Sequence, residues 1–221
     1  MDVTVDILGK TAGRDKFIRT TQYALMIVAG TAKGPIATKL GGIAKQMSSA
    51  RLVLRLYDDL PMLKSILNYG LGKHEQDLIT RISTIVGSWS IMAFYPVEHT
   101  AFLGDHKLLP VESKNWYSAG TGLWAVLLVT SIIKSFRRIC LLRRQKAKVI
   151  KQRRLESPDK NDSTANAAFR QELRGLAHEE IKEYWMIIKN GADLINAISW
   201  LPGGYLWSGK LSTFQNGVFG T

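Results

Sequence analysis

The chain has 221 residues, a single cysteine, and 30 lysine and arginine residues against 18 acids, which gives a formal charge of +12. Its hydrophobic content of 46% excludes a disordered chain. The single cysteine excludes an internal disulfide framework and suits a reducing compartment. The mean hydropathy of −0.03 argues against a polytopic transporter but leaves room for one or two membrane spans.

The excess charge is concentrated in one segment. Residues 134–154 carry ten basic side chains and no acid, whereas the rest of the chain, with 20 bases against 18 acids, is close to neutral. This distribution argues against a nucleic-acid-binding protein with a uniformly basic surface. The segment, called the basic block below, contains Lys134, Arg137, Arg138, Arg143, Arg144, Lys146, Lys148, Lys151, Arg153 and Arg154.

The N-terminal third predicts helices, and no segment alternates with the period of two that a sheet requires. A first helix should begin near Gly13 and end before Pro35. A second helix, over about residues 40–60, is amphipathic. Pro61 is expected to open a further short helix, which Gly70 ends.

The amphipathic helix has two interpretations. Its apolar side chains fall on one side, and polar side chains, among them Arg51 and Arg55, fall on the other. Such a helix can lie in a lipid headgroup layer. It can also pack against the core of a soluble helical bundle, and periodicity alone favours this second interpretation because most amphipathic helices serve cores.

Two uncharged stretches follow. Residues 115–133 form a run of 19 without a charge, and as a helix this run would be about 29 Å long, close to the roughly 30 Å hydrocarbon core of a bilayer. Trp116 and Tyr117 stand at one end, where an interfacial aromatic belt is expected. Residues 82–97 form a run of 16 that contains Pro96. We expect the first stretch to span a membrane, whereas the second could cross it, re-enter it or lie at its surface.

If both stretches cross, residues 81–133 form a membrane hairpin with a loop at 98–114. The basic block follows directly, and the positive-inside rule then puts it and both chain termini on the cytosolic side. The remaining chain is expected to form a basic helix over 134–156, an exposed linker over 157–168, and a C-terminal helix with an interfacial or membrane segment over 169–221.

The sequence offers little for enzymatic chemistry. The four histidines do not have the spacing of a zinc motif, and the single cysteine cannot complete one. Gly120-Thr121-Gly122 lacks the third glycine of a dinucleotide-binding loop, and no Gly-Lys-Ser/Thr phosphate loop occurs. We therefore expect no catalytic residue, no metal site and no cofactor, and a protein that is not an enzyme.

The basic block itself admits three interpretations. It could bind nucleic acid, yet it holds one aromatic residue, Phe136, for base stacking. It could be a solvated helix face, which is the usual role of a charge run. It could also lie on anionic lipid headgroups, where each cation contributes about 1 kcal/mol of attraction. Its position beside residues 115–133 favours the lipid interpretation.

Several motifs resemble a known family. Residues 51–61 read RLVLRLYDDLP, residues 95–99 read YPVEH, and residues 200–209 begin with WLP and end with LWSG. In order over nearly the whole chain, these motifs are similar to those of the peroxin-11 family of peroxisomal membrane proteins, in its gamma-like branch. The matching residues near the N-terminus are Gly13, Arg14, Asp15, Lys16, Arg19, Gln22 and Tyr23.

The resemblance implies an integral peroxisomal membrane protein with both termini in the cytosol, which forms homo-oligomers and elongates the membrane before fission. It also favours the headgroup interpretation of the amphipathic helix, with basic residues on the lipid. The residues of this membrane-shaping helix are Ile43, Lys45, Met47, Arg51, Leu54, Arg55 and Tyr57. The implied partners are anionic membrane lipid, the chain itself and related family members, a fission adaptor, a dynamin-related GTPase and the peroxin-19 import receptor, but not nucleic acid. The basic block and its adjacent span are the targeting candidate.

The sequence thus predicts an all-α, membrane-associated protein with amphipathic helices and one to three membrane-embedded helices. Its predicted function is remodelling, elongation and proliferation of peroxisomes. A metabolite pore and a soluble basic helical nucleic-acid-binding protein stay open as alternatives. Members of this branch continue past the LWSG stretch into another apolar run, so a C-terminal span like theirs would be incomplete here.

Overall fold

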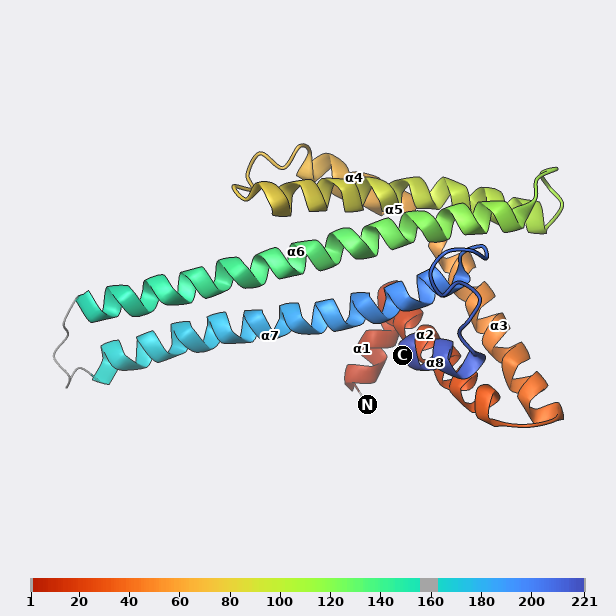
Figure 1. Cartoon of the computed structure of the whole chain (residues 1–221), viewed down its shortest axis with the longest axis horizontal. Helices are drawn as coiled ribbons and strands as arrows, with labels where there is room; N and C mark the ends of the chain where they lie inside the picture. The colour runs from red at the N-terminus through yellow and green to blue at the C-terminus, as the bar shows by residue number, and fades with distance from the viewer. Residues whose placement is uncertain (1, 156–162, 221) are drawn as a thin grey trace.

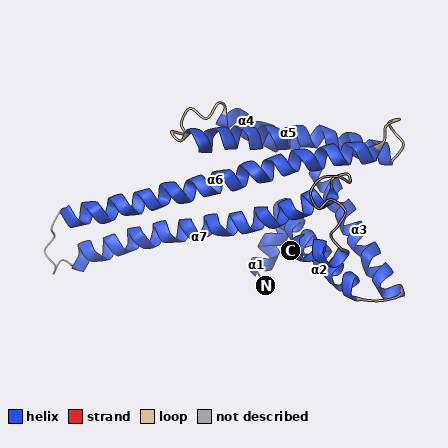
Figure 2. Cartoon of the chain, in the orientation of Figure 1, coloured by secondary structure: helices blue, strands red, loops and turns tan. Residues whose placement is uncertain are grey.

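The computed structural model describes residues 2–155 and 163–220, and all regular elements in these ranges are helices (Figures 1 and 2). This confirms the all-α fold class. The helices are α1 (Asp2–Gly9), α2 (Thr11–Thr31), α3 (Pro35–Arg55), α4 (Asp59–Tyr69), α5 (Leu78–Asp105), α6 (Ser113–Leu155), α7 (Ser163–Trp200) and α8 (Thr213–Gly220).

The long helix α6 organises the fold. It runs antiparallel to α5 on one side and to α7 on the other, and α4 lies beside α5 (Figure 1). The helices α1, α2, α3 and α8 gather around the C-terminal end of α7. Because α2 packs against both α3 and α8, the two ends of the chain lie close together.

The first helix predicted from the sequence corresponds to α2, and α1 is an additional helix that precedes it. The chain turns after α1, and α2 begins at Thr11, slightly before the predicted start. The corner brings the backbones so close that a Cβ on Gly13 would lie 1.8 Å from the carbonyl oxygen of Ile7, so this position requires glycine. The predicted end is confirmed, because α2 stops at Thr31 and Pro35 opens α3 in the first turn, where its missing N–H costs no helical hydrogen bond.

The amphipathic helix is shifted from its predicted bounds, because α3 ends at Arg55 and not near residue 60. In a continuous helix the ring of Pro61 would clash with the carbonyl group of Tyr57. The chain instead turns at 56–58 and restarts as α4, whose first turn tolerates the proline. Tyr57, predicted to lie on the amphipathic helix, is therefore in this turn and is 78% exposed. As expected, Gly70 ends α4, with a φ of +55°.

Helix α5 continues through Pro96, so the loop predicted at 98–114 is shorter and covers 106–112. The proline removes one backbone hydrogen bond from the helix. Buried contacts on either side of it compensate, since Tyr95, Glu98 and Ala101 are all below 9% exposed. The N-terminus of α5 is capped by Asp77, which accepts a hydrogen bond of 2.9 Å from the backbone N–H of Thr80.

The structure describes only part of the linker predicted at residues 157–168. Residues 156–162 lie outside the described residues. Residues 163–168, which the sequence places in the same linker, form the first turns of α7, so this helix begins earlier than predicted. The basic block lies in the C-terminal half of α6, in the same continuous helix as residues 115–133.

Among the described helices, α5 is the one that qualifies by length and composition as a candidate membrane span. The sequence pattern favours residues 115–133 over residues 82–97 as a membrane span, and the structure reverses this order. Residues 115–133 form the N-terminal half of α6, which at 43 residues is longer than a span and carries the basic block in its other half. A second crossing by residues 115–133 stays a prediction.

The interface between α5 and α6 is made by small side chains. Ser83, Gly87 and Ser90 on α5 are buried, whereas Val86 and Trp89 on the outer face are 41% and 56% exposed. A Cβ on Gly87 would lie 2.9 Å from the hydroxyl oxygen of Thr130 on α6. Small residues between the helices and large apolar residues outside are the arrangement typical of helices packed within a bilayer.

Candidate functional site

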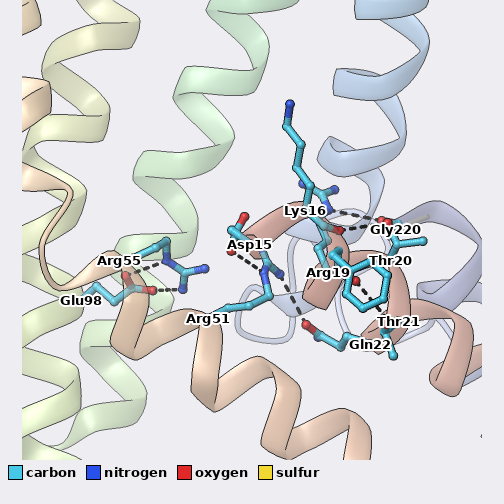
Figure 3. A network of polar contacts seen from close by, with 11 residues as sticks. Asp15, Lys16, Arg19, Thr20, Thr21, Gln22, Arg51, Arg55, Glu98 and Gly220 are labelled. Carbon is cyan, nitrogen blue, oxygen red and sulfur yellow. Dashed lines mark hydrogen bonds and ion pairs between the residues drawn. The ribbon is translucent and has the colours of Figure 1, made fainter. Parts of the chain in front are cut away.

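The two arginines of α3 point toward the protein interior (Figure 3). Arg55 pairs with Glu98 of α5 through both oxygens of the carboxylate, and the Nε–Oε2 distance is 3.1 Å. Glu98 is 5% exposed, so this pair is largely removed from water. The paired geometry matches the planar guanidinium fork and links α3 to the candidate membrane span.

Two further ion pairs continue this network toward α2 and α7. Arg51 donates from Nε to Asp15 of α2 at 2.8 Å and from Nη1 to Gln22 at 3.4 Å. Arg19 of α2 pairs with Asp193 of α7 and donates from Nε to the carbonyl oxygen of Gly220 at 3.4 Å. We call the pairs Arg19–Asp193, Arg51–Asp15 and Arg55–Glu98 the arginine network.

The seven residues of the N-terminal motif have different positions in the structure. Asp15, Arg19 and Gln22 belong to the network, and Tyr23 is buried beside it, where burial raises the pKa of its hydroxyl and the neighbouring arginines oppose that rise. Gly13 shapes the corner between α1 and α2. The remaining two motif residues, Arg14 and Lys16, are exposed.

The apolar face of α3 points outward. Ile36 is 63% exposed and Ile43 is 47% exposed, whereas Ala44, on the side of the arginines, is 4% exposed. The outward face repeats with the period of a helix and consists of Ile36, Leu40, Ile43, Met47, Ala50 and Leu54. Ile36, Ile43 and Ala50 are exposed, whereas Leu40, Met47 and Leu54 are half-buried. With both arginines turned inward and two isoleucines exposed, α3 differs from the usual helix of a water-soluble bundle, although its two lysines, Lys39 and Lys45, are exposed as well.

This orientation changes the interpretation of the predicted membrane-shaping residues. Ile43, Met47 and Leu54 lie together on the outward face, as the sequence indicates. Arg51 and Arg55, expected to contact lipid headgroups, are engaged within the protein. Lys45 is exposed and pairs with no other described residue, so it remains available to lipid.

The basic block is partly neutralised by α7. Glu180 accepts from Nε of Arg143 at 2.8 Å and also pairs with Lys146, and these two cations hold its pKa below the usual range. Arg138 lies 3.1 Å from Glu183. Composition alone does not reveal these ion pairs, because Glu180 and Glu183 lie beyond the predicted linker.

Two other members of the block are also engaged. Arg137 donates to Asp77 at 2.8 Å and holds the pKa of that carboxyl well below its usual range. Arg153 donates to Asn166 and lies over the ring of Phe169. Among the described residues, the members of the block without a partner are Lys134, Arg144, Lys148, Lys151 and Arg154.

Three functional carboxylates were not predicted from the sequence: Glu98, Asp193 and Asp77. Glu98 is the first charge after an uncharged run, which is a usable signal for a buried ion pair. Asp193 lies among apolar residues of α7, and this isolated charge is a weaker signal for a buried ion pair. Within residues 2–155 and 163–220, no group of three or more His, Cys, Asp and Glu residues is placed to hold a metal ion.

Comparison with known proteins identifies the family. The whole chain, residues 1–221, matches the family described as peroxisomal biogenesis factor 11 (PEX11). The chain belongs to this family. It is 33% identical to peroxisomal membrane protein 11C of Homo sapiens over 215 residues, covering 95% of this chain and 85% of that protein. It is 31% identical to the protein of the same name from Mus musculus over 214 residues, covering 94% and 84%. No solved structure matches the chain.

Membership confirms the family resemblance and establishes a helical peroxisomal membrane protein that acts in peroxisome biogenesis and is not an enzyme. The arginine network has a structural role, because it joins α3 to α2 and α5 while the apolar face stays free.

Proposed function

We propose that this chain promotes remodelling, elongation and fission of the peroxisomal membrane by inserting the outward face of α3 into the cytosolic leaflet. The observation that supports this proposal is the orientation of α3, with Arg51 and Arg55 turned inward and Ile36 and Ile43 exposed. Burying one isoleucine side chain in an apolar medium contributes about 1.5–3 kcal/mol. Insertion at headgroup depth spreads one leaflet relative to the other and so favours curvature.

Removing the outward apolar side chains tests this proposal. Full-length protein carrying Ile36→Ser and Ile43→Ser should bind anionic vesicles at least about tenfold more weakly, because two of the inserted side chains are lost. It should also tubulate the vesicles less, as judged by electron microscopy. Both substitutions lie at exposed positions, so the helix content from circular dichroism should be unchanged.

A matched control uses two valines of similar exposure that lie off this face, Val28→Ser on α2 and Val53→Ser on α3. This control should bind and tubulate like the wild type. If the isoleucine variant tubulates vesicles as well as the control does, insertion of α3 does not drive the remodelling.

Self-association is proposed to amplify the effect of α3. Helix α7 exposes Ile181, Trp185 and Ile188, which lie about one helical turn apart and are 53%, 66% and 60% exposed. An exposed apolar stripe of this kind is typical of an interaction surface. Crosslinking in intact peroxisomes, with and without Trp185→Ser, tests whether this stripe joins copies of the chain or related family members.

We further propose that the chain belongs to the gamma-like branch, on the basis of its RLVLRLYDDLP and YPVEH motifs. Its proposed partners are anionic lipid at the free part of the basic block, a fission adaptor with a dynamin-related GTPase, and the peroxin-19 import receptor. The exposed and unpaired cations Arg144, Lys148 and Lys151 form one stripe along α6 and supply the lipid and targeting surface.

We propose that both termini face the cytosol. The packing of α2 against α8 supports a common side for the two termini, and the basic block supports the cytosolic one. Tags at both ends should therefore be removed together by protease added to intact peroxisomes. A tag within 106–112 should be protected until detergent is added. Protection of either terminal tag would contradict this topology.

A further inference from the structure

A cavity of about 260 Å³ lies where five helices meet, namely α2, α3, α5, α6 and α7. Its walls differ sharply in chemistry. One side is formed by the arginine network, with Arg19, Arg51 and Arg55 lining the space together with Glu98. Much of the remaining lining consists of aromatic and apolar side chains of α5, α6 and α7. None of the residues proposed above to insert into the leaflet lines this cavity, so it is a separate feature of the molecule.

Three arginines and one carboxylate line the polar side of the cavity. Of the three carboxylates in the network, Glu98 lines the cavity, whereas Asp15 and Asp193 lie behind their arginines and do not. A guanidinium has five N–H donors. Arg51 and Arg19 each use one Nε and one Nη in their contacts, which leaves further donors on both side chains. The unused N–H donors of these arginines can bind an oxyanion.

The aromatic part of the lining suits an apolar chain. Phe94 and Ile91 of α5 and Trp116 and Trp124 of α6 line the cavity, together with Tyr117 and Thr121 of α6. Trp200, at the end of α7, stacks on Trp124 with ring centroids 6.0 Å apart. Aromatic side chains present large rigid apolar surfaces, so this part of the lining can cover hydrocarbon.

We infer that this cavity binds the phosphate of an anionic phospholipid, with the arginines on the phosphate and the start of an acyl chain against the tryptophans. Its volume is below the roughly 300–1,000 Å³ of pockets that enclose a whole drug-sized ligand. The cavity therefore holds a headgroup and the first part of a chain, and the rest of the lipid extends into the bilayer. A phosphate bound by these arginines would link α2 and α3 through one ligand.

Tryptophan fluorescence measures this binding directly, because Trp116, Trp124 and Trp200 line the cavity. The full chain in a neutral detergent is titrated with dihexanoyl phosphatidic acid, dihexanoyl phosphatidylcholine or inorganic phosphate. A saturable change is expected with phosphatidic acid and not with phosphatidylcholine. Inorganic phosphate should act at much higher concentration, because it lacks the chain. If it saturates the site as tightly as phosphatidic acid does, the ligand is a free anion and the lipid assignment is overturned.

Three variants locate the signal. Arg51→Gln should weaken binding of phosphatidic acid about tenfold or more, since a charge-assisted hydrogen bond is lost. Ser48→Phe fills the cavity, keeps every arginine and should weaken binding to a similar degree, which guards against a folding defect in the first variant. Arg174→Gln removes an exposed arginine far from the cavity and should change the affinity less than twofold. No saturable change in the wild type, or equal affinities in all three variants, would overturn the proposal.

Lipid binding in this cavity is distinct from the membrane-shaping function proposed for α3, and separate experiments test the two. Binding is read in detergent, where no leaflet can be bent, whereas the outward face of α3 is tested by vesicle binding and tubulation. A protein that tubulates vesicles but shows no saturable fluorescence change would retain the proposed function and lose this site.

Discussion

Replacement of Arg55 by alanine is expected to lower the free energy of unfolding by about 3 kcal/mol. The substitution leaves Glu98 as an uncompensated charge at 5% exposure, and breaking a buried ion pair from one side costs about 3–5 kcal/mol. The lower end of this range applies because the Arg55 side chain is still 29% exposed and water screens part of the interaction. For a chain of this length the expected fall in Tm is roughly 6–12 °C.

Thermal unfolding in detergent, followed by circular dichroism, measures the effect. The matched control Arg174→Ala removes an exposed arginine on α7 and should change the stability by less than about 0.5 kcal/mol. The double variant Arg55→Met with Glu98→Gln should recover much of the loss, because it removes the unpaired charge together with its partner. A Tm for Arg55→Ala equal to that of the control would show that the pair contributes little to stability.

The orientation of α3 illustrates what the sequence could and could not predict. Periodicity identified the helix and its two faces, since apolar spacing depends on residues a few positions apart. It could not decide which face meets the protein, because a polar face can be solvated or can pair internally. The deciding partners, Asp15 and Glu98, lie 36 and 43 positions from their arginines, and nothing local connects them.

The basic block shows the same limit. Its cations were visible as a run, but the carboxylate that pairs with both Arg143 and Lys146 is that of Glu180 on α7, more than thirty residues further along the chain. Long-range pairing of this kind appears only once the α6–α7 hairpin is formed. The fold class and the end of α2 were predictable, because they depend on proline, glycine and local apolar spacing.

Gly87→Leu is expected to separate α5 from α6 and to destabilise the protein by about 1–3 kcal/mol, the usual cost of overfilling a well-packed contact. A Cβ at this position would lie 2.9 Å from Oγ1 of Thr130 and 3.2 Å from a methyl group of Leu127. The threonine cannot easily turn away, because its hydroxyl donates to the carbonyl oxygens of Val126 and Leu127. The two helices must therefore move apart, and the contacts of Ser83 and Ser90 at the same interface are weakened.

The control for this prediction lies on the other helix of the same hairpin. A Cβ on Gly122 would have no neighbour within 4 Å, so Gly122→Ala should stabilise α6 by about 0.5–1 kcal/mol through reduced backbone entropy. Gly87→Ala should instead lower the Tm, because even one carbon meets Thr130. Thermal unfolding should therefore show a higher Tm for Gly122→Ala and a lower Tm for Gly87→Ala, although both variants replace glycine by alanine. If both variants raise the Tm, α5 and α6 do not approach as closely as described, and the small-residue interface is not what holds the hairpin together.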